Sequence, residues 1–592
     1  MHYAKGAGFV PEKSCMPATR EEIIQDIVDW VNLPASADVQ RLCWLSGMAG
    51  TGKSAIAHTL AGLFNEIKRL GSSFFFDASM QEQRRVSYLF STMAIDLADL
   101  DPEWKTSLWN VVKNDKALRT TSSLERQLKH FILEPTKHLN TIGPIFFVID
   151  ALDESGDRDA RASLLQALLT NVPTLPPNFR ILVTSRPDED IEEQLGSNAL
   201  VLRKRMEEVP STERDIRSYI HGELSSSRFA RLNLKWPNNE WLDRLVVLAE
   251  GLFQWAFTAC RFIKGDGKFL DPVRQLAILL SPEFSAKPSQ ALDKLYSEVL
   301  RRNFPSGNPE HALQYRSVLA CVLAARQPLS IEAIKKFVSE TGDDVASGLL
   351  EHPVDLILRP LGSLLSGVAE ISSPVLPLHS SFRDFLLHRE RSLDFHVDIS
   401  GEDDRFSIAC LNAMQTGLRF NICHLETSHL ANVDVPDLSS RIKQVIPLHL
   451  SYACRFWADH LCASSLTLET TRQVNSFMKT SFLYWLETMS LIAAIPSAIA
   501  ALHMLQGLSE VRCNQLCLTQ CLNFESIDRK WMSKLPISLP MQADSSMPFR
   551  HPLLAALHTH IYPPCPLHQL SLVYHSNIWV TFTEHSLLPW AK

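Results

Sequence analysis

No stretch of the sequence stays apolar over the ~18 consecutive residues that a membrane-spanning helix needs. The segment that comes nearest, residues 491–505, is interrupted by Pro496. The first residues also lack the basic, apolar and small-residue order of a secretion signal. These absences argue against a membrane-spanning or secreted protein, so we expect a soluble protein of the cytoplasm.

The 12 cysteines show no disulfide framework, because they are scattered along 592 residues. No similarity recurs with a period of roughly 20 to 50 residues, which argues against a repeat array. The formal net charge of −7 gives no overall attraction to nucleic acid or anionic lipid, and we expect no nucleic-acid partner. The composition, 45% hydrophobic and 21% charged, is that of an ordinary globular protein, and the length suffices for about three to five domains.

A glycine-rich octapeptide follows an apolar run at 41–46 and precedes a helical pattern at 55–64. It fits G-x-x-x-x-G-K-[ST], the pattern of a phosphate-binding P-loop. Its glycines let successive N–H groups point at a polyphosphate, its lysine supplies a charge for the β- and γ-phosphates, and its last hydroxyl is a ligand for Mg²⁺. The octapeptide consists of Gly47, Met48, Ala49, Gly50, Thr51, Gly52, Lys53 and Ser54.

Apolar strands alternate with helical patterns up to about residue 205. This alternation predicts an α/β P-loop NTPase fold, a parallel sheet with helices on both faces, in which ligands bind at the carboxyl ends of the strands. A capping box at Thr19 and Glu22 is expected to begin the first helix. Strands are predicted at 41–46, 72–76, 144–150, 179–184 and 199–202, and further helices at 55–64, 86–100, 123–133 and 158–170.

A carboxylate ends the most apolar of these strands. Asp150 is expected to hold Mg²⁺ through water while Ser54 ligates the ion directly. Asp153 and Glu154 follow within one turn, and we interpret Glu154 as the general base and Asp153 as an assistant to the metal shell. The alternative is that Asp153 and Glu154 form a solvated surface turn.

Thr184-Ser-Arg-Pro187 ends another strand of the same sheet. Arg186 can there reach a γ-phosphate and so distinguish a triphosphate from a diphosphate. A surface arginine at a strand end is the alternative. The predicted catalytic set is therefore Lys53, Asp150, Asp153, Glu154 and Arg186.

Beyond about residue 205 the sequence changes to helical patterns, with an aromatic-rich stretch at 405–508. Two strand-like runs, 367–371 and 375–379, lie between helices and suggest a winged helix. Prolines recur in the last part of the chain and break any long element there. We predict a lead-in (residues 1–18 poorly structured) and capped helix at 1–38, a nucleotide-binding domain at 39–205, a helical domain at 206–285, a winged-helix-like domain at 286–395, a second helical domain at 396–508 and an irregular, poorly ordered tail at 509–592.

Together these motifs resemble the NACHT domain of STAND-class NTPases. The P-loop, the run 146–154 and the run 184–187 occur in that family's order, and a small residue such as Ala151 after the metal aspartate is a habit of NACHT domains. The resemblance is to fungal proteins of the NOD-like-receptor type, with a nephrocystin-3-like N-terminal NACHT group, and covers roughly residues 5–500. Further similar segments are 15–20, 251–256, 452–457 and 482–487.

The resemblance gives a meaning to His379, in the segment 377–386. It implies that this histidine closes the winged helix, touches the β-phosphate of bound ADP and locks the resting state, a contact that an imidazole can make. Without the resemblance, a histidine before a helix is more often a local cap or a satisfied core group. ATP or ADP with Mg²⁺ are the implied cofactors, and the preference for adenine over guanine rests on the resemblance alone.

We therefore interpret the chain as an ATP/ADP-binding signal-transduction switch with slow Mg²⁺-dependent hydrolysis. The resemblance implies self-association in the ATP state and a place in fungal innate-immunity or incompatibility-type signalling. The alternatives are a nucleotide-binding scaffold without significant hydrolysis, a ring-type motor ATPase, for which no arginine finger is found, and a P-loop kinase. The sequence indicates neither the upstream ligand nor the downstream effector protein.

Overall fold

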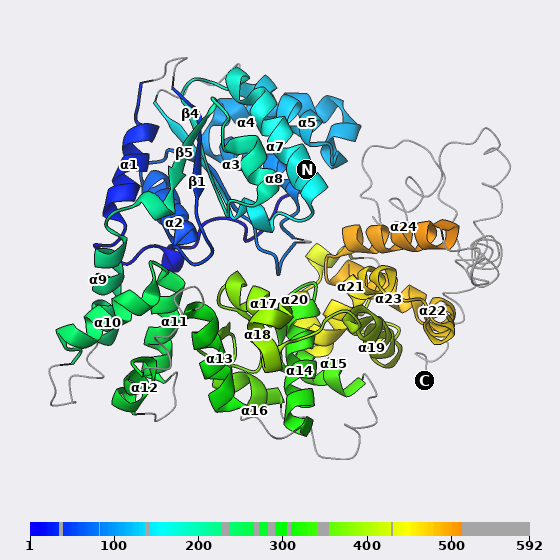
Figure 1. Cartoon of the computed structure of the whole chain (residues 1–592). Coiled ribbons are helices and arrows are strands. Elements are labelled where there is room, and N and C mark those ends of the chain that lie inside the picture. The colour runs from blue at the N-terminus through cyan, green and yellow to red at the C-terminus, as the bar shows by residue number, and fades with distance from the viewer. Residues whose placement is uncertain are drawn as a thin grey trace. The chain divides into compact units, whose positions relative to one another are not determined.

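A computed structural model gives the fold of the protein (Figure 1). The structure describes residues 1–34, 39–81, 83–136, 143–225, 236–265, 271–281, 291–304, 309–340, 354–427 and 430–511. The chain divides into two compact units, one made of residues 1–331 and 353–398 and the other of residues 332–352 and 399–592. The predicted tail lies outside the described residues, apart from the end of a helix that reaches Val511. The finer domain boundaries stay predictions.

Five parallel strands form the central sheet of the first unit, in the order β2-β3-β4-β1-β5. The prediction of a parallel sheet is therefore confirmed. Because β4 lies between β1 and β3, the strand that leads to Arg186 separates the P-loop strand from the strand that ends in Asp150. The strands are β1 (Leu42–Ser46), β2 (Leu70–Phe75), β3 (Ile145–Asp150), β4 (Phe179–Ser185) and β5 (Val201–Arg205).

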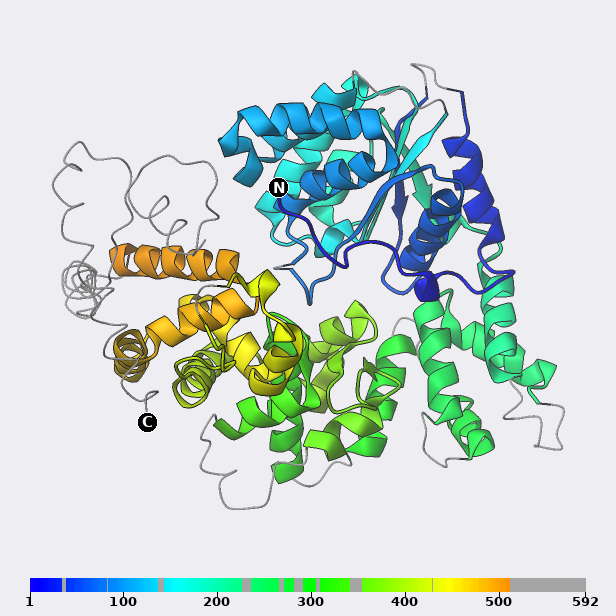
Figure 2. The ribbon, with the colours of Figure 1, turned by 180° about the vertical axis from the view of Figure 1, so that it is seen from behind.

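Helices cover both faces of this sheet, as predicted (Figures 1 and 2). Successive residues of a strand point to opposite faces, so β3 feeds two cores. Phe146 and Val148 pack in the core of α1 and α2, whereas Phe147 and Ile149 pack in the core of α3, α4, α7 and α8. The bounds of these helices are α1 (Glu21–Val31), α2 (Lys53–Glu66), α3 (Leu89–Leu100), α4 (Pro102–Asn114), α7 (Arg158–Asn171) and α8 (Glu189–Leu195).

The first residues of the chain are fixed against this domain, and the prediction that residues 1–18 are poorly structured is wrong. Side chains far along the sequence accept hydrogen bonds from their backbone. The N–H of Ala4 donates to Thr92 Oγ1 at 3.1 Å, and the N–H of Val10 donates to His58 Nδ1 at 3.0 Å. These acceptors give the segment a fixed path.

The capping box predicted for the first helix is also absent. α1 begins at Glu21, and its N-cap residue is Arg20, in the left-handed region at φ 59° and without a side-chain cap. The Thr19 hydroxyl instead donates to the carbonyl of Met16 at 2.6 Å. Tertiary contacts of the Arg20 side chain, described below, accompany this unusual backbone.

Two helical segments differ from the predictions. The segment predicted as one helix at 123–133 is a short α5 (Leu124–Gln127) followed by a π-helix (Leu128–Leu133) and α6 (Glu134–Thr136). α4 had not been predicted, although its start carries ordinary signals: Pro102 is its first residue, and Asp101 accepts from the N–H groups of Glu103 and Trp104.

The rest of the first unit is helical, with a small antiparallel sheet of order β6-β8-β7. The strand-like run predicted at 367–371 is a turn instead. Gly367 has a φ of +74°, and a Cβ there would lie 1.9 Å from the carbonyl oxygen of Pro374, so only glycine fits. The elements are α9 (Thr212–Leu224), α10 (Asn239–Ala249), α11 (Phe253–Lys264), α12 (Pro272–Leu279), α13 (Ala291–Asn303), α14 (Pro309–Ala324), β6 (Leu329–Ser330), α16 (Val354–Leu358), β7 (Leu365–Ser366), β8 (Pro374–Pro377), α17 (Ser380–Leu387) and α18 (Arg389–Ser392).

The second unit is a helical bundle whose core is aromatic. His460 is fully buried there, stacked on Phe406 and bonded to Asp403 at 2.6 Å and to the Tyr452 hydroxyl at 2.8 Å. No helix in the described ranges is long and apolar enough to cross a membrane. The helices are most of α15 (Ile331–Glu340), α19 (Glu402–Gly417), α20 (Leu438–Val445), α21 (Leu448–Ala463), α22 (Leu468–Thr480), α23 (Phe482–Leu491) and α24 (Ile495–Val511).

Candidate nucleotide-binding site

The P-loop connects β1 to α2 at the carboxyl edge of the sheet. Gly50 and Gly52 have φ angles of +84° and +95°, values that favour glycine. A Cβ on Gly50 would also lie 2.7 Å from the Cβ of Gln254, whose N–H donates to the Gly50 carbonyl at 3.0 Å. The loop is thus shaped by its own glycines and by contact with α11.

Lys53 is the first residue of α2 and is 9% exposed. Its ammonium donates to the carbonyl oxygens of Gly47 at 2.6 Å and Met48 at 2.9 Å. Burial lowers the pKa of Lys53, although Asp153 and Asp150 act in the opposite direction. Since the first N–H groups of a helix have no partner within it, the start of α2 offers a buried cation and backbone donors to one anion.

Asp150, at the end of β3, is 2% exposed. Its Oδ1 accepts a 2.5 Å hydrogen bond from Thr184 Oγ1. Burial raises the pKa of Asp150, while the hydroxyls of Thr184 and Ser54 and the charge of Lys53 oppose the rise. The aspartate of β3 and the hydroxyl of the P-loop are therefore neighbours.

This donor set fits Mg²⁺. Ser54 and Asp150 supply hard oxygen ligands, and Mg²⁺ usually takes only one or two protein ligands and completes its shell with water and phosphate oxygens. Within the described ranges, no group of three or more His, Cys, Asp or Glu residues suited to a metal occurs.

Glu154 and Asp153 lie on the short helix η5 (Leu152–Glu154), which follows β3. Glu154 Oε2 accepts the N–H of Ala78 at 3.0 Å. Burial and, to a smaller extent, the charge of Asp153 raise the pKa of Glu154 to about 7, while the N–H of Ala78 and the nearby hydroxyl of Ser380 on α17 oppose the rise. The two residues do not form a solvated surface turn.

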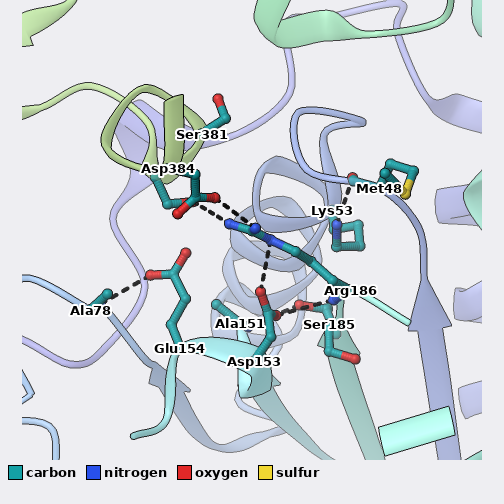
Figure 3. Close-up of polar contacts among 12 residues, drawn as sticks. Met48, Lys53, Ala78, Ala151, Asp153, Glu154, Ser185, Arg186, Ser381 and Asp384 are labelled. Carbon is teal, nitrogen blue, oxygen red and sulfur yellow. Dashed lines mark hydrogen bonds and ion pairs between the residues drawn. The ribbon is translucent and has the colours of Figure 1, made fainter. Parts of the chain in front are cut away.

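Arg186 lies beside them and is engaged on three sides (Figure 3). Its Nε is 3.1 Å from Asp153 Oδ2, its NH1 donates to Asp384 Oδ2 at 2.7 Å, and its NH2 donates to Ser380 Oγ at 3.1 Å. The N–H of Arg186 also donates to Asp153 Oδ1 at 3.1 Å. Both carboxylate oxygens of Asp153 thus contact Arg186, a different role from the predicted assistance to a metal shell.

His379 is the N-cap residue of α17, and its Nδ1 accepts the N–H of Ser381 at 3.1 Å. The neutral ring therefore carries its proton on Nε2, which leaves a donor for another group. Burial, together with the charges of Arg186 and Lys53, lowers the pKa of His379 to about 3. The histidine is thus both the local cap of the alternative interpretation and a neighbour of the two cations of the site.

A hydrogen-bonded chain connects this histidine to the P-loop. Ser381 Oγ is 2.7 Å from His379 Nδ1 and 2.9 Å from the hydroxyl of Tyr296, which is fully buried on α13. The side chain of Gln254 is close enough to the same tyrosine to lower its pKa, and the backbone N–H of Gln254 donates to the carbonyl of Gly50. Polar groups of α17, α13 and α11 therefore lie in sequence between the histidine and the loop.

The structure brings every site residue predicted from the sequence into one region of the first unit. Sequence reasoning missed their partners. Thr184 and Asp384 stand inside segments that had been quoted, but nothing in the pattern reveals what they contact. The partners missed are Arg20, Thr184, Gln254, Tyr296, Ser380, Ser381 and Asp384.

Residues 18–186 match the family model described as nephrocystin 3, N-terminal. Over 536 residues the chain is 26% identical to the vegetative incompatibility protein HET-E-1 of Podospora anserina. That alignment covers 84% of this chain but 37% of HET-E-1, so the chain spans a little over a third of that relative. The predicted resemblance to NACHT-like proteins of the fungal NOD-like-receptor type is confirmed by these two similarities.

Two solved structures show weaker similarity. One is C. elegans PCH-2, with a TM-score of 0.20, 17% identity and coverage of 45% of this chain and 62% of that chain. The other is Drosophila ORC bound to DNA, with a TM-score of 0.23, 11% identity and coverage of 86% of this chain and 71% of that chain. Scores this low support no further conclusion, and the fold rests on the strand order described above.

Proposed function

We propose that the protein is an ATP/ADP-dependent switch of the NACHT class that hydrolyses ATP slowly. One observation carries the proposal: α17 bonds to Arg186 through Asp384 and Ser380, and the hydroxyl of Ser380 is also close enough to Glu154 to lower its pKa. Arg186 and Glu154 are the two groups expected to act on a terminal phosphate, so a helix beside both can respond to the nucleotide. A switch needs two states that contact the nucleotide differently, and α17 is the element that would differ.

Each residue of the site has a task in this proposal. Lys53 and the N–H groups at the start of α2 bind the β- and γ-phosphates, while Ser54 and Asp150 hold Mg²⁺, which would neutralise phosphate charge when bound. Glu154, once released from Ser380, accepts a proton from the attacking water. The Nε2–H of His379 donates to the β-phosphate of ADP and favours the resting state.

Asp153 is assigned here to Arg186 rather than to the metal. One carboxylate oxygen of Asp153 contacts the guanidinium of Arg186, and the other accepts the backbone N–H of Arg186, both at 3.1 Å. Self-association in the ATP state and signalling to an effector are extensions from the similarity to the vegetative incompatibility protein. That relative is a longer protein, and the alignment with this chain covers 37% of it.

A second candidate is a scaffold that binds nucleotide and does not hydrolyse it. The contacts of Glu154 with Ala78 and Ser380 favour it, because a carboxylate so engaged is not free to activate water. Turnover by the purified chain, compared with that of Glu154→Gln, separates the two candidates. Glu193→Gln, on the exposed part of α8, is the matched control.

The test of the switch is the binding of ADP and of a non-hydrolysable ATP analogue with Mg²⁺, measured by calorimetry, and the size of each complex in solution. We expect both nucleotides to bind and the triphosphate complex to be larger. Lys53→Arg should abolish binding, whereas Lys105→Arg, an exposed lysine of α4, should not. A chain that binds neither nucleotide overturns the proposal, and equal sizes in both states overturn its assembly part.

A further inference from the structure

α17 presents a polar face to the nucleotide site. Ser380 and Asp384 are four residues apart and therefore lie on one side of the helix. Phe382, Phe385 and Leu386 are buried and anchor the helix in its own core. The polar pair thus has a fixed position, set by packing and not by the site itself.

Asp384 is the closest partner of Arg186. Its carboxylate accepts from NH1 at 2.7 Å, and its side chain is 33% exposed. Burial alone would lower the pKa of Arg186, but Asp384 and Asp153 outweigh that effect and raise it. Two carboxylates from different elements hold the guanidinium: Asp153, which follows β3, and Asp384, on α17 (Figure 3).

Ser380, on the same helix, lies close to both Arg186 and Glu154, the expected general base. Its hydroxyl accepts from Arg186 NH2 at 3.1 Å and lies close enough to Glu154 to lower the pKa of that carboxylate. One turn of α17 therefore bonds to Arg186 and adjoins Glu154, the two groups that a terminal phosphate would need. A phosphate at Arg186 would also stand beside the Asp384 carboxylate, and like charges so close oppose each other.

We infer that Asp384 competes with the terminal phosphate of a nucleoside triphosphate for Arg186, and so sets the preference of the site for diphosphate over triphosphate. This inference rests on the proposed function and identifies Asp384 as the residue that distinguishes the two nucleotides. A diphosphate lacks the group that would reach Arg186, so the ion pair persists when it binds. A triphosphate must displace Asp384, and its displacement frees Ser380 and Glu154 as well.

The test measures the ratio of the dissociation constants for ADP and a non-hydrolysable ATP analogue, both with Mg²⁺. Asp384→Asn keeps the shape of the side chain and removes its charge. We expect it to shift the ratio toward the triphosphate by roughly tenfold, the scale of a charged hydrogen bond, with ADP affinity unchanged. Asp394→Asn, an exposed aspartate of the same unit, is the control and should leave the ratio as it is.

A double-mutant cycle with Arg186→Gln separates competition from a general change in the protein. Without the arginine, Asp384→Asn should no longer shift the ratio. If Asp384→Asn unfolds the chain, Asp384→Glu provides the second test, and it should keep a ratio near that of the wild type. An unchanged ratio in Asp384→Asn, or the same shift with and without Arg186, overturns the inference alone. A wild-type chain that binds neither nucleotide overturns the proposed function, and the inference with it.

Discussion

Thr184 and Asp150 stand at the ends of neighbouring strands and share a 2.5 Å hydrogen bond. The threonine hydroxyl donates to the buried carboxylate and accepts the N–H of Ala151 at 3.1 Å. This bond orients the oxygen atoms of Asp150, which is expected to face Mg²⁺. A carboxylate held in this way is positioned before any ion arrives.

Replacement of Thr184 should therefore weaken the binding of Mg²⁺ more than the binding of the nucleotide itself. Thr184→Val removes the donor and leaves a buried carboxylate oxygen without it, which costs about 1–3 kcal/mol of stability. We expect the Mg²⁺ dependence of nucleotide binding to move to higher concentration, measured by titration at fixed nucleotide. Thr184→Ser keeps the hydroxyl and should restore both properties. Equal Mg²⁺ dependence in Thr184→Val and the wild type would refute the positioning role.

The pKa of about 7 at Glu154 predicts a dependence on pH. Hydrolysis that uses the carboxylate as base should rise with pH through about 7, and Glu154→Gln should remove this rise along with turnover. The effect on stability has the opposite sign. Because the folded pKa lies above the ordinary value of 4.5, the folded state binds the proton more tightly, and stability is lost as pH rises from about 4.5 to 7.

Denaturant unfolding at pH 5 and pH 8 measures this second effect. Relative to the wild type, Glu154→Gln should be more stable at pH 8 than at pH 5, because the amide carries no charge to bury. Glu193→Gln should show no such difference. A parallel pH dependence of the wild type and Glu154→Gln would argue that Glu154 keeps an ordinary pKa.

The sheet and its site were predictable because their signals are local. Apolar runs mark β1, β3 and β4, and each leads to a part of the site, so a parallel sheet brings the P-loop, Asp150 and Arg186 to one edge. His379 differs, because its place before a helix indicates only a local cap, and the family resemblance alone gave it a place in the site. Position along a strand was enough for the other residues.

The partners were not predictable, because they depend on contacts far apart in the chain. Arg186 and Asp384 are separated by 198 residues, and neither pattern points to the other. The first residues of the chain looked unstructured for a similar reason: the acceptor for the N–H of Val10 is His58, 48 residues away. The run 367–371 gave the opposite error, because the positive φ of Gly367 ends β7 at Ser366 and begins a turn where the sequence indicates a strand.

The hydroxyl of Tyr296 should matter for the diphosphate state. Tyr296→Phe removes the contact with Ser381 Oγ, which holds His379, at an expected cost of about 1 kcal/mol of stability. The stabilisation of the chain by ADP, measured as the rise in Tm, should fall, and that by a triphosphate analogue should change less. Tyr315→Phe is the control, because Tyr315 is also buried but, among the described residues, its hydroxyl bonds only to the Phe395 carbonyl, at 3.4 Å. Equal losses in both variants would argue for packing alone.

Arg20 connects the N-terminal segment to the P-loop. It is 2% exposed, its NH2 donates to the carbonyl of Thr51 at 2.8 Å, its NH1 donates to Thr212 Oγ1 at 2.7 Å, and its guanidinium lies 4.6 Å from the centre of the Phe253 ring. Arg20→Lys keeps the charge but loses the planar guanidinium, whose two terminal nitrogens reach the Thr51 carbonyl and the Thr212 hydroxyl at once. The loop should then lose part of its shape, and nucleotide affinity should fall roughly tenfold, since a charged hydrogen bond is worth about 1.5 kcal/mol or more.

Arg41→Lys is the matched control for this last prediction. Arg41 also bonds to backbone carbonyls, those of Val172, Pro173 and Leu175 at 2.6–2.9 Å, but it precedes β1 and so lies at the opposite end of that strand from the P-loop. Loss of the guanidinium nitrogen that makes all three bonds should lower the free energy of unfolding and leave the affinity for nucleotide unchanged. If both variants lower stability alike and neither changes the affinity, Arg20 is a structural arginine, and the N-terminal segment has no influence on the loop.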